Sequence, residues 1–343
     1  QQVGKVGSIP ITVKQILDGR FSSLSDLAEN VASGLSVGTR GMRLRDLAEI
    51  CGASIGEVAD AADELQMHRL VEVDRDRVSV IHDLFRRALY GRLGPGRAAV
   101  LHETVGRQKE RAKGNMAAGE LAIHYELAGI PTAAAEFGWI AGRRALSHGA
   151  VSEAAHFFEL VTRNEQDERR RARASAHWAT AMHLCRDMQK ASLLLESAAT
   201  KLRRVGLEGE ARRLEIQRIS ALQETATLAV DDLVERLGAI KQEALASSDW
   251  EAVAHALDLE LRMLQLDERL ESALALFPEF RAVLRAGNPE SRAIAYQGLA
   301  VGRLLDDPEQ ALVAAVQAVD LADKRSAGQR FTSMNRLLIV LLQ

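Results

Sequence analysis

Residue types that could hold a metal ion or act as a nucleophile are sparse in this chain, which has 9 His and 2 Cys among 343 residues. The densest group is His177, His183 and Cys185, but a spacing of i, i+6 and i+8 does not place three ligands on one face of a helix. The sequence shows no nucleophile–base pair and no carboxylate pair suited to acid–base work. We therefore predict no catalytic residue, no metal site and no enzymatic activity within these residues.

Two glycine-rich stretches were natural candidates for a phosphate cradle. Gly4-Lys5-Val6-Gly7 lacks the preceding loop and the Ser or Thr of a P-loop, and the pattern G-x-x-x-x-G-K-[ST] does not occur in the sequence. Residues 91–96 follow a predicted helix, and Pro95 removes a backbone amide donor. The second stretch is interpreted as an interdomain turn, and we expect these 343 residues to bind no cofactor by themselves.

A further candidate site lies at residues 81–90, which read Ile-His-Asp-Leu-Phe-Arg-Arg-Ala-Leu-Tyr. Asp83 is placed to open a helix, because a carboxylate is favoured at a helix N-terminus. His82 precedes it, and an imidazole can donate a hydrogen bond to an anion and titrates near neutral pH. By its position alone, His82 is a polar cap between a hairpin and this helix.

Three helices are predicted ahead of His82. Ser25 can cap the first, which runs to about Leu35, and residues 44–51 form a short amphipathic second helix. Ser54 and Glu57 form a capping box that opens the third helix. The apolar side chains of this third helix are expected to face a core: Ile55, Val58, Ala62, Leu65 and Met67.

Two short alternating strands, at residues 70–73 and 78–81, follow the third helix and flank a polar turn. Three helices followed by a hairpin are the order of a winged helix, which we place at residues 21–96 after a linker or domain tail at residues 1–20. The third helix is acidic, with Glu57, Asp60, Asp63 and Glu64 against Arg69. Because contacts to DNA phosphates need cations, this helix argues against DNA binding.

Residues 97–343 give no strand signal and predict a tetratricopeptide-like α-solenoid of paired helices, with a repeat of 34–40 residues. One unit partly matches the tetratricopeptide pattern through Gly142, Ala154 and Phe158, although the Trp, Tyr and final Pro of that pattern are absent. A weaker echo consists of Ala311, Ala315 and Ala318. The predicted fold class is all-α with one small β-hairpin: a winged helix followed by this solenoid.

At Ile81-His82-Asp83 the chain resembles the signal-transduction ATPases with numerous domains, or STAND ATPases. In that family a nucleotide-binding domain and a helical lid precede a winged helix, a Met-His-Asp motif follows the wing, and helical repeats come next. Here Ile stands in place of Met. The pattern His-Asp-Leu-x-Arg-x-Ala-Leu-Tyr is similar to the bacterial branch of LuxR-type regulators and relatives of the maltose-regulon activator.

The resemblance implies a regulatory and sensor part of a STAND-type transcriptional regulator. It implies that His82 contacts the β-phosphate of ADP in an intact parent protein, where ATP and ADP bind a domain absent from these residues. The helical repeats would bind an inducer or a partner protein, and DNA would bind only through another domain. Two alternatives stay open: a regulatory module of a protein kinase or nucleotide cyclase, or a scaffold that binds only proteins.

Composition supports a water-exposed protein with no membrane contact. The net charge is -3, and no run of about 18 apolar residues is present. Two Cys do not make a disulfide framework, which favours a reducing compartment and a cytoplasmic location. The chain starts without Met and stops within an amphipathic pattern, so we expect a fragment of a longer protein.

Overall fold

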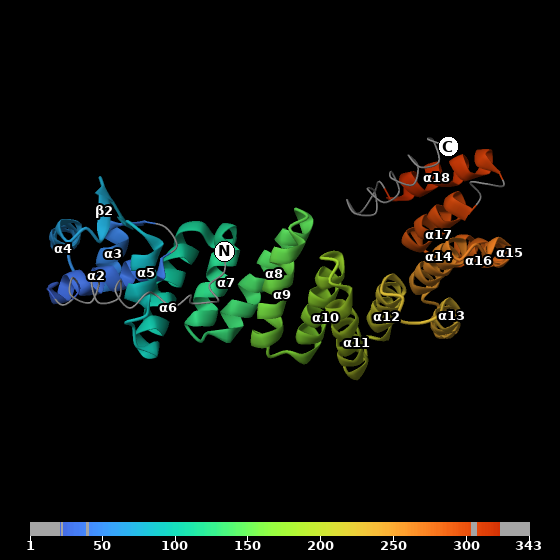
Figure 1. Cartoon of the computed structure of the whole chain (residues 1–343), viewed down its shortest axis with the longest axis horizontal. Helices are drawn as coiled ribbons and strands as arrows, with labels where there is room; N and C mark the ends of the chain where they lie inside the picture. The colour runs from blue at the N-terminus through green and yellow to red at the C-terminus, as the bar shows by residue number, and fades with distance from the viewer. Residues whose placement is uncertain (1–20, 22, 39–40, 303–306, 323–343) are drawn as a thin grey trace. The chain divides into compact units, whose positions relative to one another are not determined.

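The computed structural model describes residues 21, 23–38, 41–302 and 307–322 (Figure 1). Helices dominate these residues, and the described parts contain one small sheet, which confirms the predicted all-α class. The chain divides into two compact units: one holds the residues up to Arg144 together with Arg163–Glu165, and the other holds the rest. The boundary predicted near residue 96 lies inside the first unit and stays a prediction. The features expected at residues 1–20 and 323–343 lie outside the described residues.

The first unit begins with the elements that lead to His82. These are helix α2 (Asp26–Val37), strand β1 (Met42–Arg43), helices α3 (Leu44–Cys51) and α4 (Ile55–Met67), strands β2 (Val71–Asp74) and β3 (Arg77–Val80), and helix α5 (Asp83–Tyr90). The N-cap of α2 is Ser25, and Ser54 and Glu57 form the predicted capping box of α4. Local hydrogen-bonding rules are therefore enough to start both helices.

The sheet is antiparallel, in the order β1-β3-β2, and has one strand more than the predicted hairpin. Strand β1 pairs Met42 with Val78 and Arg43 with Arg77. A strand of two residues is too short to show an alternating pattern, so no sequence pattern predicts it. Its pairing anchors the hairpin to the segment that precedes α3.

Two predicted core residues of α4 are exposed instead: Ile55 is 53% and Met67 is 78% exposed. Val58, Ala62 and Leu65 are buried as predicted. Ile55 stands at the first turn of the helix, beyond the core, and Met67 follows Leu65 by two positions, which turns it to the opposite side of the helix. The core of this region is otherwise built on fully buried leucines, including Leu47, Leu65 and Leu70.

The remaining helices follow without a strand among the described residues. They are α6 (Pro95–Lys113), the 3-10 helix η1 (Gly114–Ala117), α7 (Ala118–Leu127), α8 (Pro131–Ser147), α9 (Val151–Asn164), α10 (Glu168–Leu184), α11 (Met188–Arg204), α12 (Glu208–Glu224), α13 (Val230–Ala246), α14 (Trp250–Leu266), α15 (Leu270–Ala275), α16 (Phe277–Ala286), α17 (Pro289–Gly302) and α18 (Pro308–Ala322). None of the described helices is long and apolar enough to cross a membrane.

Within the second unit, successive helices pack side by side across short turns (Figure 1). Asp167, Asp187 and Asp249 cap α10, α11 and α14 with their side chains. Small residues allow the helices to approach closely: the predicted Ala154, and Ala311, Ala315 and Ala318, are all buried. These are the features of a tetratricopeptide-like helical repeat.

Two glycines of α17 leave space for two aromatic rings of α16. An ideal Cβ at Gly298 would lie 2.5 Å from the ring of Phe280, and one at Gly302 would lie 2.8 Å from the ring of Phe277. Phe280 is fully buried. The close packing of α16 on α17 therefore depends on the missing side chains at these two positions.

Candidate functional site

His82 lies at the junction between strand β3 and helix α5, and its side chain is exposed. Its Nδ1 accepts a hydrogen bond from the backbone N–H of Leu84 at 3.1 Å, which makes His82 the N-cap of α5. The backbone N–H of the preceding Ile81 donates to the carbonyl of Leu70 at 3.2 Å and so ties the junction to the start of β2. The predicted capping position is thus confirmed.

This cap has a consequence for the second ring nitrogen of His82. In a neutral imidazole, one nitrogen carries the proton while the other accepts. Because Nδ1 accepts from Leu84, the neutral ring carries its proton on Nε2. An exposed imidazole whose Nε2–H is not used by the cap can donate to an anion, which is the chemistry that the resemblance attributes to His82.

Charged neighbours fix the start of α5. Arg86 contacts Asp83 at 2.7 Å, and Arg87 contacts the other carboxylate oxygen of Asp83 at 2.7 Å. The hydrogen bond from Arg86 lowers the pKa of the Asp83 carboxyl below its ordinary value. Arg86 also donates to the carbonyl of Ser36 at 3.4 Å, which links α5 to the end of α2. The first turn of α5 is therefore held in place independently of the His82 ring.

The glycine-rich stretch at residues 91–96 forms the turn between α5 and α6 and the start of α6; both helices lie in the first unit, and the interdomain role stays a prediction. Gly91 caps the end of α5, Gly94 is the N-cap of α6, and Pro95 is its first residue. Neither Gly91 nor Gly94 has a positive φ. Proline is favoured at the first position of a helix, where its missing N–H costs nothing.

A buried chain of polar side chains that the sequence did not reveal lies just beyond this turn. The Tyr90 hydroxyl is 3.1 Å from Nε2 of His102, and Nδ1 of His102 is 2.9 Å from Nδ1 of His124. His102 is 4% exposed and His124 is 3% exposed. These three side chains connect α5, α6 and α7. They therefore join the helix that His82 caps to the next two α-helices.

Burial keeps both imidazoles of this chain neutral. It lowers the pKa of His102 to about 4 and, together with the neighbouring His102 and Lys109, lowers the pKa of His124 to about 3. One Nδ1 must therefore donate to the other, because two neutral rings share a single hydrogen bond. His102 and His124 are 22 residues apart, and sequence spacing alone does not show that they meet.

The histidines of the second unit have neighbours of their own. The ring of His177 stacks on Phe158 at 4.8 Å, and burial lowers the pKa of His183. Cys185 lies 3.6 Å from the Ser152 hydroxyl. The described residues contain no group of three His, Cys, Asp or Glu that could hold a metal ion. His156 of α9 is exposed.

Two of the acidic residues of α4 have structural roles. Glu57 closes the capping box with Ser54, and Glu64 accepts hydrogen bonds from the backbone and the hydroxyl of Ser25. These contacts lower the pKa of both carboxyls. Asp60 and Asp63 are exposed. The exposed face of α4 is therefore anionic.

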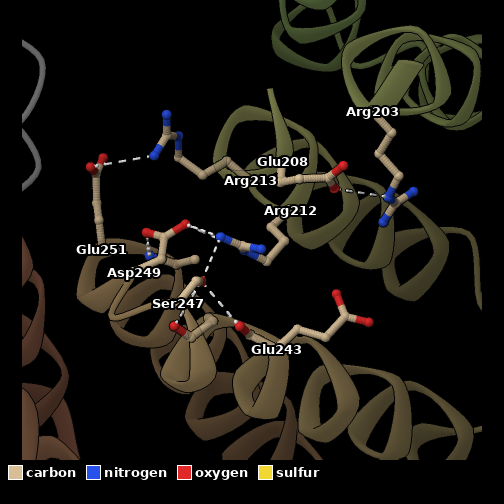
Figure 2. A network of polar contacts seen from close by, with 10 residues as sticks. Arg203, Glu208, Arg212, Arg213, Glu243, Ser247, Asp249 and Glu251 are labelled. Atoms are coloured by element: carbon tan, nitrogen blue, oxygen red, sulfur yellow. Dashed lines mark hydrogen bonds and ion pairs between the residues drawn. The ribbon is translucent and has the colours of Figure 1, made fainter. Parts of the chain in front are cut away.

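Polar pairs also connect equivalent positions along the helical repeats, at separations of 37 or 38 residues. They include Arg163–Glu126, Arg173–Glu210, Thr180–Gln217, Arg186–Glu224, Arg212–Asp249, Arg213–Glu251, Lys241–Glu279 and Arg269–Asp231. The spacing lies within the predicted repeat of 34–40 residues. Figure 2 shows part of this series, where Arg212 and Arg213 of α12 meet the start of α14.

Comparisons with known proteins place few constraints on this chain. No protein-family model matches the sequence, and no curated protein sequence matches it. Among solved structures, the chain is similar to the Signal Transduction ATPase with Numerous Domains (STAND) protein with a tetratricopeptide repeat sensor from Pyrococcus horikoshii, with 10% identity and a TM-score of 0.41. The likeness covers 99% of this chain and 57% of that chain, so this chain spans little more than half of its length. At this TM-score the likeness carries no argument about function.

Proposed function

We propose that this chain is the regulatory and sensor part of a STAND-type transcriptional regulator of the LuxR-type branch. The observation that carries the proposal is His82, which caps α5 through Nδ1 and leaves Nε2 available to an anion. In an intact protein with a nucleotide-binding domain, His82 contacts the ADP phosphate and stabilises the resting state. The element order from α2 to β3 supports a winged helix as the support for this residue.

The helical repeats take the sensor role in this proposal. They bind an inducer or a partner protein, and binding shifts the population from a closed to an open state. DNA binds through a domain outside these residues, and the exposed acidic face of α4 supports that division of labour. The chain itself is neither an enzyme nor the nucleotide site, and the protein acts in the cytoplasm.

The test separates the cap from the phosphate contact by two substitutions in the intact protein. His82→Ala removes both the cap and the imidazole, whereas His82→Asn keeps a good N-cap and removes Nε2. We expect both variants to release fluorescent ADP about tenfold faster than the wild type, as the loss of one hydrogen bond to a charged group predicts. Basal activity should rise in parallel.

If His82→Asn retains ADP as the wild type does, His82 is only a helix cap and the phosphate contact is wrong. Determining the complete coding sequence distinguishes the remaining alternatives. A P-loop before Gln1 with a helix-turn-helix after Gln343 supports the regulator, and a kinase or cyclase domain supports the signalling enzyme. The absence of a P-loop from the complete protein supports the scaffold.

A further inference from the structure

A small cavity lies in the first unit, where helix α2, the end of α5 and the start of α6 meet. Its volume is about 110 Å³, and it is partly open to solvent. A benzene molecule fits an apolar protein cavity of about 150 Å³. The space therefore suits a ligand no larger than benzene, and the chemistry of the surrounding residues decides which small molecule can bind.

Two exposed arginines form the rim of this cavity. Arg92 lies in the turn after α5, and Arg97 lies in the first turn of α6. The guanidinium of Arg92 is 5.2 Å from the ring centroid of Phe21, and Nη2 of Arg97 donates to the side chain of Asn30. Neither contact neutralises a positive charge. Because a guanidinium binds a carboxylate through paired N–H donors, this rim favours an organic acid.

The start of α6 adds to the attraction for a negative charge. Leu93 and Arg97, on either side of the N-cap Gly94, both line the cavity. Helix α6 has 19 residues, no side chain caps its N-terminus, and its first turn contains no acidic residue. The partial positive charge at this helix end is therefore not compensated by the helix itself, and it reinforces the charge of the two arginines.

One carboxylate opposes an anion at the rim. Glu29 of α2 lines the cavity, and its Oε1 lies 3.8 Å from Nη2 of Arg92. The Glu29 side chain is 52% exposed, so solvent screens its charge. Within the part of the chain that the structure describes, no carboxylate pairs with Arg97. We therefore expect Glu29 to weaken the binding of an acid without preventing it.

The interior of the cavity combines apolar walls with one unused hydroxyl group. Phe21 and Leu89 line it and are 3% and 4% exposed. Ser33 of α2 also lines it and is 6% exposed. Among the described residues, the Ser33 hydroxyl has no hydrogen-bond partner. Buried hydroxyl groups normally form hydrogen bonds, so a ligand oxygen atom inside the cavity would satisfy this one.

We propose that this cavity binds a short hydroxy- or keto-carboxylate. The carboxylate binds Arg92 and Arg97 at the rim, and the carbon chain lies against the apolar walls. The second oxygen atom of the ligand forms a hydrogen bond with the Ser33 hydroxyl in the interior. The cavity lies at the end of α5 opposite to His82, and its ligand needs no nucleotide-binding domain, so this inference goes beyond the proposed function.

The test titrates the full 343-residue chain with β-hydroxybutyrate and follows saturation transfer to the methyl group of the ligand by NMR. Butyrate lacks the hydroxyl group, and the methyl ester of β-hydroxybutyrate lacks the negative charge. We expect butyrate to bind about fivefold and the ester about tenfold more weakly than β-hydroxybutyrate. Equal binding of the three compounds contradicts the proposal, and so does a Kd above about 10 mM for β-hydroxybutyrate.

Substitutions then locate the ligand. Ser33→Ala should weaken the binding of β-hydroxybutyrate about fivefold and leave butyrate unchanged, because it removes only the partner of the ligand hydroxyl. Arg97→Met should weaken both acids about tenfold and leave the ester unchanged. Arg107→Met is the matched control and should change nothing, because Arg107 is an exposed residue of α6 that does not line the cavity and pairs with Glu103 at 2.7 Å.

The proposal is wrong if Ser33→Ala leaves the binding of β-hydroxybutyrate unchanged, or if Arg107→Met weakens binding as much as Arg97→Met. Glu29→Gln has the opposite expected sign: it removes the opposing carboxylate and should tighten both acids about twofold. Should Arg97→Met fail to fold, Glu29→Gln decides in its place, and weaker binding of the acids to that variant contradicts a cationic rim.

Discussion

In the first unit two buried histidines bond each other as neutral side chains, whereas in the second unit pairs of charged side chains recur at a regular spacing. His102 and His124 are buried, and the half-buried Tyr90 bonds the outer nitrogen of His102. The pairs of the second unit, such as Arg173–Glu210, are mostly half-exposed and recur at 37 or 38 residues. The two arrangements should fail under different conditions.

The buried neutral side chains and the half-exposed charged pairs stabilise the protein in different ways. A neutral buried chain is insensitive to salt, but each member depends on the others, because an unpaired polar group in a core is costly. A half-exposed ion pair contributes little by itself and is screened by salt. Recurring pairs therefore align repeats, while a unique buried chain locks three particular helices together.

The largest expected effect is the loss of the central residue of the neutral chain. His102→Ala leaves the Tyr90 hydroxyl and His124 Nδ1 without their partner and opens a cavity between α5, α6 and α7. We expect the free energy of unfolding of this region to fall by about 3 kcal/mol. Native-state hydrogen exchange of α6 and α7 measures it. The control His156→Ala, at an exposed position, should change the free energy of unfolding by less than about 0.5 kcal/mol. If the two substitutions destabilise the protein equally, the buried histidines have no special role in stability.

Acid should weaken the same region. Unfolded imidazoles take up protons near pH 6.5, but the folded pKa values of His102 and His124 are lowered to about 4 and about 3. Stability from these rings is therefore complete above about pH 6.5 and is lost as the pH falls toward 4. We expect a loss of roughly 2 kcal/mol between pH 6.5 and pH 5.5 in the α6–α7 region, followed by hydrogen exchange corrected for intrinsic rates.

The variant His124→Asn sharpens the acid experiment, because an amide can replace Nδ1 of His124 and does not titrate. The acid-induced loss in α6 and α7 should then be about half of that in the wild type. Burial also lowers the pKa of His183 and His255 in the second unit, so the measurement must be resolved by region. An unchanged acid response of α6 and α7 in His124→Asn would show that other groups cause it.

Local signals in the sequence predicted the elements well where a short stretch decides the structure. The Ser54–Glu57 capping box, the helix at residues 44–51 and the cap at His82 each depend on residues within one turn. Apolar spacing overestimated burial at Ile55 and Met67, since periodicity does not say where a core ends. Strand β1 was missed because two residues carry no pattern.

Long-range polar contacts could not be predicted in the same way. The meeting of His102 with His124 depends on how α6 crosses α7, and no local rule fixes that crossing. The charged pairs have a weak signal in the sequence, because the two members of a pair are one repeat length apart, as Arg173 and Glu210 are. The same holds for Arg212 and Asp249. This signal can be used only when the repeat length is known to be 37 or 38 residues, and the sequence alone predicts a range of 34 to 40.

The smallest expected effect belongs to a single recurring pair on the surface. Arg173→Gln removes the contact to Glu210, in which the Arg173 side chain is 45% exposed. We expect the free energy of unfolding to fall by less than about 1 kcal/mol, because solvent screens the pair and ordering both side chains costs entropy. Raising the salt concentration to about 1 M should shrink even this difference, since the Debye length falls to about 3 Å. Urea titrations of the wild type and the variant at low and high salt measure this difference in the free energy of unfolding. If the variant instead loses more than about 2 kcal/mol at both salt concentrations, such pairs stabilise the repeats rather than align them.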